Sequence, residues 1–450
     1  MALGCSIRLL ELAVIEPKVL PDTAAFQIQS THPIWSVDFL AGQRPVFVPA
    51  VWKLLGGNHW AIVVGQAVAA AAVWWWLGVT LMERSRHRLA VGGGVVAVSL
   101  LPSSLVWDGV LQGESVAITL TVAAVAVWLR CDWARPVVAL TVVLAVWALT
   151  KETHAQLLVF IVPVFVWRRR WIAAAVLVGV FGFSQWSTAV GERWAFPFDN
   201  IVGREVYADS ELAGWFEDRG MPELELSEEE ARFFGQVNND RAGEFTAYQE
   251  WRNAEGRGAL VGWLATHPDH AIGRTVDGLQ DHPLLDWYDP EGWVPVLPSP
   301  PAAIAFPIAG IIAIRARSKQ GAVVLGLAVV GAVLAANSDA MEHARHLVVP
   351  ATAAWLALLV SLGDVDGRHD GERVVRGPGD RNALLPAGTR AGGGAVVDRQ
   401  DRGVHVHSSD TDDVGGACIE RVDGADRLAW TGGGEVGRRE PCWEAPSPVE

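Results

Sequence analysis

The sequence predicts an all-α integral membrane protein, a multi-span helical bundle with a helical extracytoplasmic insertion. First, 51% of the 450 residues are hydrophobic, a larger share than the roughly 45–50% of soluble domains. Second, these residues gather in runs without a charged side chain, such as 61–81 and 136–150. Third, the chain has 22 Trp and only 3 Tyr, and many of these indoles lie near the ends of the runs, where amphipathic rings favour the lipid headgroup level.

The apolar runs define about nine expected spans. A bilayer core needs roughly 20 apolar residues per helix, so the shorter runs require neighbouring helices that shield them. In chain order the expected spans are 60–81, 89–106, 114–130, 136–150, 154–167, 171–189, 300–314, 321–336 and 347–363.

Basic residues occupy every second connection between these spans. They are Arg84, Arg86, Arg88, Arg130, Arg135, Arg168, Arg169, Arg170, Arg315, Arg317 and Lys319. The positive-inside rule predicts that such connections face the cytoplasm. The remaining segments are then extracytoplasmic: 1–59, 107–113, 151–154, 190–299 and 337–346. An odd number of spans puts the C-terminal tail in the cytoplasm.

The chain therefore divides into five expected parts. They are a first extracytoplasmic segment (1–58), six spans (59–189), an extracytoplasmic loop domain (190–299), three spans (300–363) and a cytoplasmic tail (364–450). Aromatic pairs such as Trp215-Phe216 stand between charged residues of the loop domain and predict a small helical cap. The tail is rich in Gly, Arg, Asp and Val without apolar periodicity, which predicts disorder.

An extracytoplasmic N-terminus implies translocation without a preceding helix, or a first helix that is missing. Residues 1–16 are half apolar, and we interpret them as the remnant of such a span. The four cysteines form neither a metal spacing nor a disulfide set. No cofactor or metal is expected, and the absence of a basic stripe argues against nucleic acid as a partner.

Charged side chains recur in the expected extracytoplasmic segments. The first segment holds Asp22, Asp38 and Arg44, the second has Glu114 at the start of a span, and the third has Lys151 beside Glu152. Each carboxylate alone can be a solvated loop residue, and Glu114 can serve as an acid at a helix N-terminus. Lys151 can pair with Glu152, with Glu114 or with a lipid phosphate. Acids at the mouth of a span usually face a cavity.

Arg345 stands in the last extracytoplasmic segment, where the positive-inside rule gives no reason for a basic residue. A guanidinium presents a fork of donors suited to phosphate. An ion pair with Asp339 or Glu342 is the alternative. Together, acids and bases at one membrane face suit an enzyme that acts on a charged, lipid-linked substrate. Sugar transfer of this kind needs a carboxylate base for the acceptor hydroxyl and cations for the leaving phosphate.

Three stretches carry a family resemblance: Asp22 followed by GQRPVFVPAVWKLLG (42–56), LPSSLVWDGVLQGESVAITL (101–120), and EHARHLVVP (342–350). In their order and membrane side they resemble the GT-C class of polyprenyl-phosphate-sugar-dependent glycosyltransferases, which includes protein O-mannosyltransferases and aminoarabinose transferases of lipid A. The resemblance covers roughly residues 20–363.

The resemblance implies roles for these residues. Asp22 would be the catalytic general base, and Arg345 would contact the lipid-linked phosphate. The remaining candidates would bind substrate: Asp38, Arg44, Glu114 and Lys151. The implied activity is inverting transfer of a sugar from a polyprenyl-phosphate donor to an extracytoplasmic lipid, glycan or protein, with membrane lipid and the lipid-linked sugar as partners. Two alternatives stay open: a polytopic transporter or flippase, and a non-catalytic protein of envelope assembly.

Overall fold

The computed structural model describes residues 1–11, 16–20, 22–131, 137–206, 209–241, 243–280, 302–338 and 343–364. Within these ranges the chain is helical, with no strand and one isolated bridge between Lys18 and Val110. The predicted all-α class is therefore confirmed for the described residues. The tail expected at 364–450 lies outside them, apart from its first residue.

Four helices are long and apolar enough to cross a membrane: α5 (His59–Arg84), α11 (Trp171–Val190), α20 (Lys319–Ala336) and, from His346 onward, α21 (His343–Asp364). Shorter apolar helices accompany them: α6 (Arg88–Ser99), α9 (Val137–Ala148), α10 (Glu152–Trp167) and α19 (Ala302–Ala316). With α8 (Glu114–Arg130), one apolar helix lies in each of the nine predicted runs. The run predicted at 89–106 is interrupted, because α6 ends at Ser99 and is followed by the short helix α7 (Pro102–Leu105) and a 3-10 turn. Their composition indicates association with a membrane.

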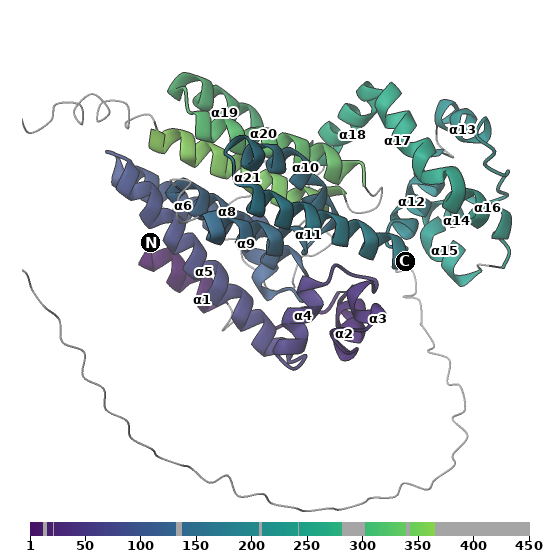
Figure 1. Ribbon diagram of the computed structural model, residues 1–450, viewed down its shortest axis with the longest axis horizontal. Helices are drawn as coiled ribbons and strands as arrows, with labels where there is room; N and C mark the ends of the chain where they lie inside the picture. The colour runs from purple at the N-terminus through teal and green to yellow at the C-terminus, as the bar shows by residue number, and fades with distance from the viewer. Residues whose placement is uncertain are drawn as a thin grey trace, which may run out of the picture. The chain divides into compact units, whose positions relative to one another are not determined.

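These helices form a bundle whose buried apolar side chains fall into several core clusters. Helix α21 packs against α19 and α20, α5 packs against α8, and α10 packs against α11 (Figure 1). Trp74, Leu77, Ile118 and Leu356 are buried in one core cluster, and a second cluster forms around Leu158 on the α9–α11 side. Exposed apolar side chains remain on the bundle surface, as expected of helices that face lipid rather than water.

The N-terminal helix α1 (Ala2–Glu11), within the stretch interpreted as the remnant of a span, packs along α5 and α6. Its Arg8 is almost fully buried and forms an ion pair with Asp108. The same guanidinium donates to the carbonyl oxygens of Ser99 (3.0 Å) and Ser104 (2.9 Å). Because a buried charge is stable only when it is paired and hydrogen-bonded, these contacts fix α1 in the bundle.

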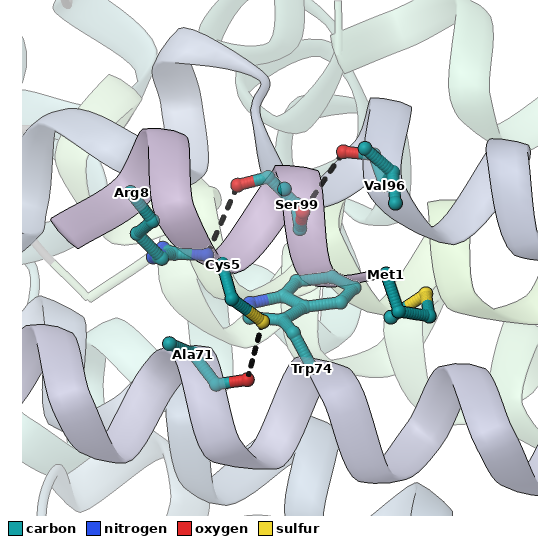
Figure 2. Close-up of a pocket in the computed structure, with 8 residues that line it drawn as sticks. Met1, Cys5, Arg8, Ala71, Trp74, Val96 and Ser99 are labelled. Carbon is teal, nitrogen blue, oxygen red and sulfur yellow. Dashed lines mark hydrogen bonds between the residues drawn. The ribbon is translucent and has the colours of Figure 1, made fainter. Parts of the chain in front are cut away.

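A small cavity lies between α1, α5 and α6 (Figure 2). Figure 2 shows Cys5 of α1 facing Ala71 of α5, with Trp74 beside it. The Cys5 Sγ donates to the Ala71 carbonyl oxygen at 3.4 Å. The cavity has room for about one water molecule. It is therefore a packing gap and is too small for a sugar or a lipid.

Between α11 and α19 the chain forms a helical loop domain. Its main helices are α12 (Ala195–Ile201), α13 (Ser210–Glu217), α14 (Glu228–Arg232), α15 (Phe234–Asp240), α16 (Thr246–Trp251), α17 (Arg257–Thr266) and α18 (Pro268–Gln280). Phe198, Phe216, Phe234 and Trp251 are buried together in its core. Helix α18 packs against α20 and so joins the domain to the bundle.

A buried carboxylate organises this domain from inside. Asp199 accepts hydrogen bonds from Asn238 (2.7 Å) and Tyr248 (2.8 Å), and it pairs with Arg252 at 2.7 Å. Burial raises the pKa of Asp199, and Arg252 together with the two hydrogen bonds opposes that shift. The network joins α12, α15, α16 and the π-helical segment Arg252–Gly256 that follows α16, so it specifies how these short helices pack.

Candidate functional site

Six charged side chains gather at one end of the bundle, and we call them the polar cluster: Asp22, Arg44, Glu114, Lys151, Glu152 and Arg193. Each stands at or beside the end of a helix. Asp22 precedes α2 (Thr23–Thr31), Arg44 precedes α4 (Phe47–Leu54), and Arg193 follows α11. Glu114 opens α8, and Glu152 opens α10 directly after Lys151.

Apolar contacts bring the first segment onto the bundle. Phe26 of α2 and Trp52 of α4 are buried with Ile62 of α5 and Leu111, which precedes α8. Next to them, Thr23 donates a hydrogen bond to the carbonyl oxygen of Leu111 at 3.0 Å. Asp22 therefore lies close to the connection that carries Glu114.

Asp22 and Arg44 form the most accessible pair of the cluster. Their side chains form an ion pair, with 21% of Asp22 and 30% of Arg44 exposed. Gln29 holds the backbone of this loop, because its side-chain amide accepts from the Arg44 N–H and donates to the carbonyl oxygens of Phe39 and Arg44, each at 2.8 Å. A carboxylate held beside a guanidinium and open to solvent can meet a polar substrate.

Glu114 and Lys151 form a buried pair. The Lys151 ammonium donates to Glu114 at 3.0 Å, and the exposed fractions of the Lys151 and Glu114 side chains are 13% and 0%. Of the partners considered for Lys151, the structure selects Glu114. Glu114 also lies in the first turn of α8, where the helix dipole favours a negative charge.

Arg193 connects the loop that carries Arg44 with Glu152 of α10. Its Nε lies 2.7 Å from Glu152, and its Nη1 donates to the carbonyl oxygens of Gly42 (3.2 Å) and Arg44 (3.1 Å). Burial lowers the pKa of Arg193, and the neighbouring Glu152 opposes that shift. One guanidinium thus links the first segment to the start of α10.

His154 lies one turn beyond Lys151 and is also buried. Its ring stacks on Trp147, with the centroids 4.3 Å apart, and its Nδ1 lies 2.9 Å from the Thr150 hydroxyl. The ring is within electrostatic range of both Lys151 and Glu114. His154 therefore lines the inner side of the polar cluster.

The structure thus brings together four of the six residues singled out from the sequence: Asp22, Arg44, Glu114 and Lys151. Asp38 stands apart, because its side chain is 73% exposed and its ion-pair partner is His32, 3.8 Å away. The side chain of Arg345 lies outside the described residues, so its approach to Asp22 stays a prediction.

Arg193, Glu152 and His154 were missed as site residues by sequence reasoning. Arg193 could have been found from the sequence by the reasoning used for Arg345, because both are basic residues in segments expected outside the cytoplasm. Glu152 and His154 carried none beyond their closeness to Lys151. Three carboxylates and three cations balance in the cluster, so it can either position a substrate or lock the segments together.

No group of three or more His, Cys, Asp or Glu side chains with metal-binding geometry occurs among the described residues. Comparison with protein-family models, curated proteins and solved structures found no match for this chain. The function must therefore be argued from the polar cluster itself.

Proposed function

We propose that this protein is a GT-C-like membrane glycosyltransferase. It moves a sugar from a polyprenyl-phosphate donor to an extracytoplasmic acceptor, with inversion at the anomeric carbon. In this proposal nine helices cross the membrane, and the polar cluster and loop domain face the extracytoplasmic side. The observation that supports it is the accessible Asp22–Arg44 pair beside two less exposed cations, Lys151 and Arg193, at one end of an apolar bundle.

The proposed reaction needs one base and several cations. The acceptor hydroxyl attacks the anomeric carbon and gives its proton to the Asp22 carboxylate. The bond between the anomeric carbon and the phosphate oxygen breaks, and polyprenyl phosphate leaves. Arg345 stabilises the charge of this leaving phosphate, as the family resemblance implies. Arg44 orients Asp22, and the Glu114–Lys151 pair and Arg193 hold the surrounding segments in place.

Replacing Asp22 tests the proposal. In Asp22→Asn the side chain keeps its shape and can no longer accept a proton, so sugar transfer should fall by about 10²- to 10⁴-fold. Transfer from a labelled polyprenyl-phosphate sugar is measured in membranes that contain the full chain. Asp218→Asn, an exposed change on the loop domain, is the matched control and should leave transfer unchanged. Full activity of the Asp22→Asn variant would remove Asp22 from the mechanism.

A non-catalytic role in envelope assembly is the second candidate. The equal number of carboxylates and cations in the polar cluster favours it, because such a network can serve only to hold segments together. In that case the folded wild-type protein shows no transfer with any lipid-linked sugar. Asp22→Asn then lowers the unfolding temperature without changing any catalytic readout.

A further inference from the structure

We propose that the turn between α10 and α11 binds the headgroups of anionic phospholipids. We call this turn, Trp167 to Ile172, the Trp–Arg turn. It carries Arg168, Arg169 and Arg170 between two tryptophans. The inference concerns a different surface from the polar cluster and does not depend on the proposed transferase activity.

The turn places an arginine where helices usually have glycine. Arg169 N–H donates to Val166 O (2.9 Å) and Arg170 N–H donates to Phe165 O (2.8 Å), the two hydrogen bonds of a Schellman motif. Arg169 takes the left-handed position of that motif, with φ 55°. A side chain with a Cβ costs free energy there, so this arginine is not the residue that best stabilises the turn.

The end of α19 repeats this arrangement. Arg317 has φ 50°, its N–H donates to Ile314 O (3.0 Å), and the next N–H, of Ser318, donates to Ala313 O (2.9 Å). Two helix ends thus carry arginine in the left-handed position. Either position would be more stable as glycine. The third described non-glycine residue with positive φ is Glu192 (φ 48°), after α11 at the polar-cluster end, whereas both such positions at the basic end hold arginine.

Both turns lie at the same basic end of the bundle. Arg84, at the end of α5, donates to Leu129 O (2.6 Å) on α8 and to Gln320 (2.8 Å) on α20. Helices α8 and α10 both begin at the polar cluster, where Glu114 pairs with Lys151, so their last residues, Arg130 and Trp167, lie toward the opposite end of the bundle. The described basic residues of this end are Arg84, Arg86, Arg88, Arg130, Arg168, Arg169, Arg170, Arg315, Arg317 and Lys319, against the acids Glu83 and Asp364.

The exposed apolar side chains of this turn indicate that the anion bound by its arginines belongs to a lipid headgroup. Trp167 is 77% exposed, Trp171 62% and Ile172 84%. The Arg168 guanidinium lies 5.2 Å from the centre of the Trp167 ring. Indole rings favour the headgroup level of a bilayer, and a guanidinium there can bind a phosphate through two hydrogen bonds. A free phosphate would use the arginines and leave these apolar side chains in water.

The test compares phosphatidylglycerol with phosphatidylcholine on the full chain in detergent, with lipids retained by the protein counted by native mass spectrometry. The wild type should retain phosphatidylglycerol preferentially. The triple variant R168Q/R169Q/R170Q should lose about tenfold or more in affinity for it, because each basic residue near an anionic surface contributes to attraction. R168K/R169K/R170K keeps the charge and should keep most of the preference.

Two controls separate this site from general charge and from folding. R219Q/R232Q/R257Q removes the same charge from exposed positions of the loop domain and should keep the preference. Arg169→Gly removes one guanidinium while relieving the left-handed position. It should unfold at a higher temperature in neutral detergent and still retain less phosphatidylglycerol than the wild type.

Three results would overturn the proposal. Equal retention of the two lipids by the wild type would show that no anionic headgroup is selected. Unchanged preference in both the triple glutamine variant and Arg169→Gly would place the lipid elsewhere. Displacement of phosphatidylglycerol by millimolar inorganic phosphate would show that the arginines bind a free anion and not a lipid surface.

Discussion

At the scale of single residues, burial decides what each charge in the polar cluster can do. Glu114 is fully buried with Lys151 as its ion-pair partner, whereas Asp22 and Arg44 keep 21% and 30% of their side-chain surface exposed. A buried pair is destabilising to break and contributes little when it is replaced as a whole. In an accessible ion pair, either side chain can bind a polar group of a substrate in place of its partner. We therefore assign a structural role to the Glu114–Lys151 pair and a role in substrate chemistry to the Asp22–Arg44 pair.

The Glu114–Lys151 pair gives a prediction about stability. Lys151→Met leaves a carboxylate in the bundle without its ion-pair partner and should lower the free energy of unfolding by about 3 kcal/mol. Glu114→Gln combined with Lys151→Met removes both charges and should recover most of that loss. Thermal unfolding in detergent measures both. A double variant as unstable as the single one would show that the pair is not a closed unit.

At the scale of elements, a close backbone approach places Arg193. A Cβ on Gly191, just after α11, would clash with the carbonyl oxygen of Ala41. Only glycine lets the end of α11 come this near the loop that carries Arg44. The contact therefore positions Arg193 against Gly42 and Arg44. It could not be predicted from the chain, because glycines are frequent in apolar helices whether or not another backbone approaches them.

Gly191→Ala should push the end of α11 away from this loop. We expect a loss of about 1–3 kcal/mol in unfolding free energy, as for other overpacked sites, together with weaker transfer activity. Gly182→Ala is the matched control in the same helix, because a Cβ there meets nothing within 4 Å. It should be neutral or stabilise by about 0.5–1 kcal/mol. Equal effects of the two changes would contradict the close approach.

Helix α14 gives a prediction about pH. Hydrogen bonds from the Ser227 N–H (2.9 Å) and hydroxyl (2.8 Å), together with Arg241, lower the pKa of Glu230 to about 2. Its ordinary value is about 4.3. Because the folded state lowers this pKa, the carboxylate adds stability above about pH 4.3 that is lost as the pH falls toward 2.

The measurement is the difference in unfolding temperature between the wild type and Glu230→Gln. The wild type should be the more stable of the two at pH 7, and the difference should shrink at pH 3. A difference that stays constant between these two pH values would show that the charge of Glu230 plays no part in the start of α14.

At the scale of the whole molecule, the apolar runs predicted the helices well. Runs without charge became α5, α9, α11 and α20, because apolar periodicity and length are local properties of a chain. Of the Trp215-Phe216 pair, Phe216 is buried in the core of the loop domain and Trp215 packs against it partly buried. The ion pair of Arg8 with Asp108 was not predictable, because it joins residues one hundred positions apart that meet only after packing.

The polar cluster, too, was predictable only in part, because some of its residues meet only after distant segments pack. Asp22, Arg44, Glu114 and Lys151 could be singled out because they are charges in connections expected on one side of the membrane. Arg193 and Glu152 gain their place only through contacts between distant segments. Asp38 lies in one of the same connections and stays outside the cluster, so position in a connection does not by itself bring a residue into the site.

We propose that the polar cluster transfers a sugar from a lipid-linked donor. The most direct measurement is the full chain in liposomes with polyprenyl-phosphate sugars, following free polyprenyl phosphate and the anomeric configuration of the product. We expect one polyprenyl phosphate to be released for each inverted glycoside formed, and little of either product from Asp22→Asn. Folded wild-type protein that releases none from any donor tested, or an Asp22→Asn variant that matches the wild type, would contradict it.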